Sequence, residues 1–157
     1  MNRPDDAHFR ATLGHYLTGV TVVAAHTDQG PTGFTCQSFA SLSLDPPLII
    51  FAATTLSQSW PRVREAGVVG VSILSQSQED IARQFATTGA DKFAGVGHRL
   101  SPAGAPLIEG AIAHVEGTVI SVSTHGDHDV VVVAVTGVDH FGGEPLAYFR
   151  GGFRSLD

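Results

Sequence analysis

The chain has 157 residues, of which 43% are hydrophobic and 15% charged, and its formal net charge is −6. This length fits one domain, which we expect to span residues 1–157. The charge excludes ordinary nucleic-acid binding, because such binding needs clustered Lys and Arg, and only nine basic residues are spread along this chain. The high apolar content indicates subunit contacts, and a homodimer is the simplest assembly.

The single cysteine, Cys36, cannot form an internal disulfide, and neither a signal peptide nor an apolar span of membrane length is apparent. We therefore expect a cytoplasmic protein with no membrane partner.

The predicted elements of the first half are a helix over 6–18, strands over 20–25, 33–39 and 48–53, a helix over 57–66 and a strand over 68–74. Phe9 and Leu13 give the first helix its apolar spacing, and Asp5 or Asp6 is its candidate N-cap. The second helix has Pro61 in its first turn and Gly67 as its stop.

The second half predicts a helix over 77–87, a loop over 88–110, and strands over 111–124, 129–139 and 146–149. A Ser77-x-x-Asp80 pattern resembles a capping box for the helix. Because strands and helices do not alternate regularly, a doubly wound fold is disfavoured. We expect a mainly β protein with peripheral helices, whose sheet closes into a small barrel because closure removes exposed edges.

One stretch, Gly33–Leu48, is rich in hydroxyl groups from Thr35, Ser38, Ser41 and Ser43. Hydroxyls and turn-exposed backbone N–H groups can hold an anion without lysines. The alternative is an ordinary serine-rich loop between two strands.

Two further chemistries remain open from the residues alone. Cys36 could be a nucleophile, although an unpaired cysteine is usually a small buried hydrophobe. His114, His125, Asp127 and His128 could bind zinc or a haem, but no His-Glu-x-x-His or Cys-x-x-Cys spacing supports this. Gly126-Asp127-His128 also fits a plain solvated turn.

Seven segments occur in a fixed order: Leu13-Gly14 with Gly19–Val23, Gly33–Leu48, Ser57-x-Ser59-Trp60, Asp91–Gly95, Leu107–Gly110, Gly126–His128 and Pro145–Gly151. Together they resemble the flavin reductase-like, FMN-binding split-barrel family. In particular, the chain is similar to the reductase components of two-component flavin-dependent monooxygenases.

The resemblance implies a homodimeric split β-barrel of Greek-key type that binds FMN or FAD and takes hydride from NADH or NADPH. It also implies that a separate monooxygenase receives the reduced flavin. The alternative is a flavin-binding protein or electron carrier of the same fold without reductase turnover. No catalytic side chain beyond the cofactor chemistry and no metal is implied.

By this resemblance, the flavin-binding residues are Gly33, Phe34, Thr35, Cys36, Gln37, Ser38, Ser41, Ser43, Ala52, Ala53, Thr54, Ser57, Ser59, Trp60, Gln84 and Phe85. Ser57 and Ser59 would face the flavin phosphate, and the backbone amides of 52–54 would face the pyrimidine edge. The NAD(P)H-binding residues are His128, Tyr148, Phe149, Arg150 and Gly151. Relatives often carry Lys at position 55 and Arg at 58 or 84, so Thr55, Gln58 and Gln84 predict weaker or more FMN-selective binding.

Overall fold

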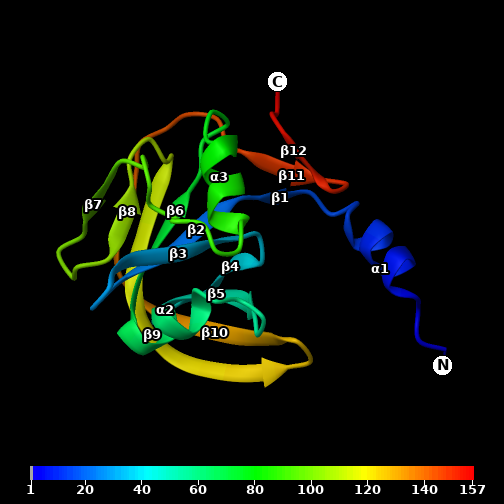
Figure 1. The fold of residues 1–157 in the computed structure, drawn as a ribbon, viewed down its shortest axis with the longest axis horizontal. Coiled ribbons are helices and arrows are strands. Elements are labelled where there is room, and N and C mark those ends of the chain that lie inside the picture. The colour runs from blue at the N-terminus through cyan, green and yellow to red at the C-terminus, as the bar shows by residue number, and fades with distance from the viewer. Residues whose placement is uncertain (1) are drawn as a thin grey trace.

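The structure is a computed structural model that describes residues 2–157, and these residues form three helices and a large antiparallel sheet (Figure 1). The helices are α1 (Asp6–Leu13), α2 (Trp60–Ala66) and α3 (Glu79–Ala86). None of the helices in the described chain is long and apolar enough to cross a membrane.

The main sheet has seven strands in the order β3-β2-β6-β9-β10-β5-β4. Their bounds are β2 (Thr21–Thr27), β3 (Gly30–Cys36), β4 (Phe39–Leu44), β5 (Pro47–Thr54), β6 (Val68–Ile73), β9 (Ala113–His125) and β10 (His128–His140). Two smaller sheets contain β1 (Thr18–Gly19), β11 (Ala147–Phe149) and β12 (Gly152–Arg154), and β7 (His98–Leu100) with β8 (Pro106–Ile108). The expectation of a mainly β protein with peripheral helices is confirmed.

The two edge strands of the main sheet, β3 and β4, are consecutive in the chain and are joined by Gln37 and Ser38. The sheet therefore curls until its edges approach one another, and the Ala52 amide of β5 donates to the Ser38 carbonyl at 3.2 Å. Within residues 2–157, no ladder pairs β3 with β4, so the predicted closed barrel is not seen.

The core is divided into two clusters because β2 is buried on both faces. Val23 and Ala25 join the cluster beneath α2, which contains Phe51 and Trp60. Val22 and Ala24 join the cluster beneath α3, which contains Phe85 and Leu74. A strand that is buried on both faces has a continuous run of apolar residues in its sequence, and β2 has such a run.

Several predicted elements need correction. The first helix ends at Leu13 instead of residue 18, because the chain beyond Gly14 turns and then forms β1, which pairs with β11. At the other end of this helix, Asp5 is the N-cap, and its side chain accepts a hydrogen bond from the His8 amide at 2.8 Å. The capping box at Ser77 is wrong: Gln78 is the N-cap of α3, and the Ser77 hydroxyl bonds the Ser75 hydroxyl. The predicted loop over 88–110 contains the β7–β8 hairpin.

Candidate functional site

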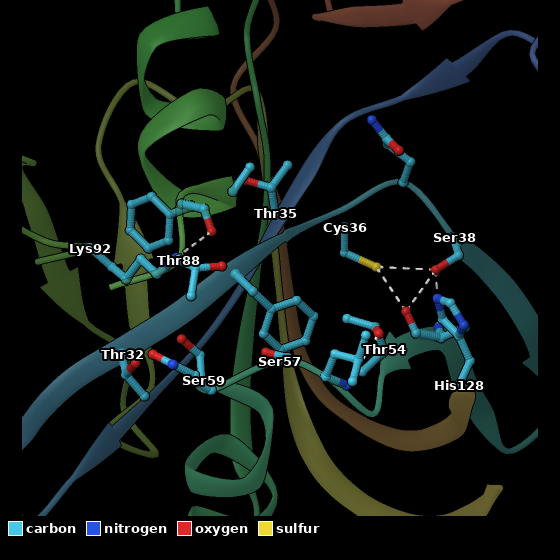
Figure 2. Close-up of a pocket in the computed structure, with 18 of the residues that line it drawn as sticks. Thr32, Thr35, Cys36, Ser38, Thr54, Ser57, Ser59, Thr88, Lys92 and His128 are labelled. Carbon is cyan, nitrogen blue, oxygen red and sulfur yellow. Dashed lines mark hydrogen bonds between the residues drawn. The ribbon is translucent and has the colours of Figure 1, made fainter. Parts of the chain in front are cut away.

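A cleft of about 1340 Å³ lies between β3, β5, the segment before α2 and the loop after α3. Figure 2 shows Cys36, Ser38 and His128 toward one end of this cleft, and Thr32, Ser59 and Lys92 toward the other. Both walls come from elements that the sheet curvature brings together, since β3 and β5 are five positions apart in the strand order.

Twelve of the predicted ligand residues line this one cleft. They are Phe34, Thr35, Cys36, Gln37, Ser38, Ala52, Ala53, Thr54, Ser57, Ser59, Phe85 and His128. They come from four separate segments of the chain, so the fold gathers them. Their roles toward flavin or NAD(P)H remain predictions.

The other predicted residues lie outside the lining of the cleft: Gly33, Ser41, Ser43, Trp60, Gln84, Tyr148, Phe149, Arg150 and Gly151. Ser41 and Ser43 are on the edge strand β4. Gly33 faces β2, and a Cβ there would lie 2.6 Å from the Val23 carbonyl oxygen.

Trp60 and Gln84 have clear structural contacts instead. The Trp60 indole is buried against Phe34 and Phe51 and donates from Nε1 to Asp129 Oδ2 at 2.8 Å. The Gln84 amide nitrogen lies 2.9–3.0 Å from the carbonyl oxygens of Asp91, Lys92 and Ala94. Gln84 therefore holds the loop after α3, whose residues 88–92 line the cleft.

The segment Tyr148–Gly151 lies beside the end of α1. Tyr148 packs edge-on against Phe153 with ring centroids 5.2 Å apart. Arg150 adopts a left-handed conformation with φ of 51°, and its amide donates to the Gly14 carbonyl at 2.8 Å. These contacts tie the C-terminal hairpin β11–β12 to the N-terminal segment.

The hydroxyl groups in the cleft divide into those already used as donors and those still able to donate. The Thr35 hydroxyl donates to Ala82 O at 2.6 Å, and the Ser38 hydroxyl donates to Ala52 O at 2.8 Å while accepting from the Ala52 amide. The Ser57 hydroxyl accepts from the Trp60 amide at 3.0 Å, so its own proton is available. Ser59 makes no side-chain capping bond to α2. The hydroxyl groups of Ser57 and Ser59, both before α2, are therefore available to donate to a ligand.

Cys36 is a structural thiol. Its sulfur lies 3.4 Å from the Ser38 hydroxyl oxygen, and burial raises the pKa of the thiol. It is therefore protonated at neutral pH, which removes the thiolate that a nucleophile would need.

His128 lies toward one end of the cleft and is oriented by its neighbour Asp127. Its Nδ1 lies 2.7 Å from Asp127 Oδ1, and this hydrogen bond holds the pKa of Asp127 below its usual value. Because an ionised carboxylate only accepts, Nδ1 carries the proton and Nε2 is free to meet a ligand.

The four predicted zinc ligands do not form one site, although His125 and His128 are partners in the β9–β10 pairing. His114 stands near the start of β9, and His125 is the last residue of the same strand. His114 is buried, its Nε2 lies 2.8 Å from the Ile108 carbonyl, and burial lowers its pKa. No group of three metal-ligating side chains is close enough to hold an ion within residues 2–157.

Two cations line the cleft but were not among the predicted site residues, namely Arg62 and Lys92. Lys92 donates to the carbonyls of Phe85 and Thr87, and burial lowers its pKa. Arg62 is three residues after Ser59, a spacing that could have placed both on one helix face. By contrast, Thr55 lies outside the cleft, and its hydroxyl donates to the Asp127 carbonyl. Gln58 does line the cleft.

Residues 13–157 match the protein family described as flavin reductase like domain, and the chain belongs to this family. The predicted family is therefore confirmed. The chain is 40% identical over 156 residues to the reductase subunit HsaB of a flavin-dependent monooxygenase from Mycobacterium tuberculosis, which covers 98% of this chain and 83% of that protein.

Two other relatives support the same family. An NADH-dependent flavin reductase from a Rhodococcus species is 36% identical over 155 residues, covering 96% of this chain and 86% of the relative. Among solved structures, the NADH:FAD oxidoreductase SgcE6 of Streptomyces globisporus C-1027, in complex with NAD and FAD fragments, superposes with a TM-score of 0.92 at 33% identity. That match covers 100% of this chain and 96% of SgcE6.

Proposed function

We propose that this chain is a flavin reductase that uses NADH to reduce FMN or FAD and supplies the reduced flavin to a separate monooxygenase. One observation carries the proposal: the β3 and β5 walls, the serines before α2, and His128 line a single cleft. The names of its relatives, a monooxygenase reductase subunit and an NADH-dependent flavin reductase, favour this function over a flavin carrier without turnover.

The cleft fits a planar ring with a phosphorylated tail. Phe34, which is only partly buried, supplies aromatic surface, while Ser57 and Ser59 supply hydroxyl donors at one end. Bound flavin and nicotinamide would supply the redox chemistry themselves, by transfer of a hydride from nicotinamide C4 to flavin N5. The protein therefore needs to bind and orient the two rings and needs no strong base.

The individual walls have distinct tasks in this proposal. Ser38 fixes the β3–β4 junction against β5 through its bonds to Ala52, which keeps the ring-binding wall rigid. His128, held by Asp127, presents Nε2 where the nicotinamide amide would lie. Ser57 and Ser59 bind the flavin phosphate.

The larger assembly belongs to the same proposal. We place the reductase in the cytoplasm as a homodimer, in which the curled sheet serves as a split barrel of Greek-key type. The exposed apolar side chains Phe9, Leu13 and Tyr16 near the N-terminus support a subunit contact. The chain forms a single domain, consistent with one strand order that runs through the main sheet.

The test is to mix the purified protein with NADH and follow the loss of NADH absorbance with FMN, FAD, riboflavin or no flavin. We expect oxidation that depends on added flavin. NADPH in place of NADH measures the preference between the two donors. Absence of flavin-dependent oxidation with both donors would sink the proposal, and flavin binding without oxidation would favour the carrier.

A further inference from the structure

Arg62 is a cation in the lining of the cleft that the sequence motifs left without a role. It lies in the first turn of α2 and is partly buried. Its Nη2 reaches the Thr27 hydroxyl at 3.4 Å, beside the β2–β3 hairpin. Thr32, on β3 of that hairpin, and Ser59, the N-cap of α2, line the same cleft.

Arg62 retains its donors, unlike the other cation that lines the cleft. Lys92 already donates to two carbonyls, and the neighbouring Asp91 also lines the cleft. Arg62 forms no ion pair with any carboxylate in the part of the chain that the structure describes. Of its five N–H donors, the single contact at 3.4 Å uses one weakly.

A partly buried guanidinium in the lining of a cleft that Ser59 and Thr32 also line is suited to a phosphate group. Arg binds phosphate oxygens through two parallel N–H donors, and such charge-assisted bonds are about twice as strong as neutral ones. The overall charge of −6 repels an anionic ligand, so a local cation is needed to offset it.

We propose that Arg62 binds the phosphate of the flavin mononucleotide moiety, together with Ser59, and so makes the protein select phosphorylated flavins over riboflavin. This inference rests on the proposed flavin reductase function. It assigns to Arg62 the charge that Thr55 and Gln58 do not supply.

The experiment measures the dissociation constants of FMN, FAD and riboflavin from the quenching of flavin fluorescence, for the full chain and for Arg62→Gln. We expect the constants for FMN and FAD to rise about tenfold or more in Arg62→Gln, and that for riboflavin to change less than twofold. Arg62→Lys should recover part of the FMN affinity. Added salt should weaken FMN binding to the full chain more than to Arg62→Gln.

Arg64→Gln is the matched control, because Arg64 lies on the same helix outside the cleft, with its guanidinium 3.9 Å from Asp129. It should leave all three constants unchanged. If FMN and riboflavin weaken equally in Arg62→Gln, or if neither weakens, the phosphate assignment is overturned.

NADH also carries phosphates, so a second arm measures the KM for NADH with riboflavin as acceptor. We expect Arg62→Gln to leave this value unchanged. A rise there with unaltered FMN binding would assign Arg62 to the pyridine nucleotide and overturn the inference. If the full chain binds no flavin, the proposed function itself fails.

Discussion

A substitution of His128 can distinguish NADH binding from flavin binding, the two events that the proposed function requires. His128 lines the cleft, and its Nδ1 lies 2.7 Å from Asp127 Oδ1. We expect His128→Ala to raise the KM for NADH several-fold while the flavin dissociation constant stays within about twofold, because one lost hydrogen bond contributes about 0.5–1.5 kcal/mol. Steady-state kinetics and flavin titration measure the two quantities. If flavin affinity falls instead, His128 belongs to the flavin pocket.

Asp129 on β10 links α2 and β9 through two hydrogen bonds, and it makes the stability of the fold depend on pH. Hydrogen bonds from Trp60 Nε1 at 2.8 Å and Thr124 Oγ1 at 2.7 Å hold the pKa of Asp129 below its usual value. A depressed folded pKa gives stability that is present above the unfolded pKa of about 3.9 and is lost as pH falls through the folded pKa.

Asp129→Asn should therefore lower the free energy of unfolding at pH 7. The difference in the free energy of unfolding between the two proteins should narrow as pH falls below about 4 and through the lower folded pKa of Asp129, because the carboxyl is protonated first in the unfolded chain and then in the folded protein. Urea unfolding at a series of pH values measures both curves. If the difference in the free energy of unfolding does not vary with pH, the charge of Asp129 does not contribute to stability.

At the scale of the elements, the β2–β3 pair explains Gly33 without a ligand. A Cβ at this position would lie 2.6 Å from the Val23 carbonyl oxygen and 3.0 Å from the Ala24 Cβ. We expect Gly33→Ala to destabilise the fold by about 1–3 kcal/mol through overpacking. Gly19→Ala is the control, since a Cβ there meets nothing within 4 Å.

Thermal unfolding of the two variants measures this effect. Equal stability of Gly33→Ala and the unaltered protein would contradict the packing explanation. In that case the glycine would be free for the flavin contact that the family resemblance implies.

Local signals predicted many elements, and tertiary contacts decided the rest. Gly67 placed the end of α2 correctly and Pro61 lies in its first turn as predicted, because the chemistry of a helix start and stop is local, although the helix begins at Trp60 and not at the predicted residue 57. The strand β4 was missed because its Phe39–Leu44 sequence is rich in serine and its pairing with β5 is not visible in its own residues. The end of α1 was missed because the strand β1 that follows it depends on β11, far along the chain.

The same limit applies to the cleft. Ser57 and Ser59 were predicted and do line it, because the motif holds both near the start of α2. Trp60, in the same motif, turns into the core toward Asp129, and Gln84 turns to the loop after α3. A motif fixes the backbone position, whereas neighbours from distant segments decide which side chain faces the ligand.

At the scale of the molecule, α1 is the element whose position the single chain explains least. Figure 1 shows it standing apart from the main sheet, and none of its residues is buried. Phe9 and Leu13 are 54% and 56% exposed, and Tyr16 just beyond the helix is 78% exposed. An amphipathic helix normally buries its apolar stripe, so the stripe needs a partner surface, which in a homodimer the second copy supplies.

We therefore expect a dimer in solution and expect Phe9→Ser to weaken it by about 2 kcal/mol, close to thirtyfold in the dissociation constant, as for a buried aromatic anchor. Analytical ultracentrifugation over a range of concentrations measures the change. Leu100→Ser is the control, because Leu100 is 50% exposed on the β7–β8 hairpin, which Figure 1 places on the side away from α1. A monomeric protein, or a dimer weakened by Leu100→Ser alone, would show that the α1 stripe does not form the contact.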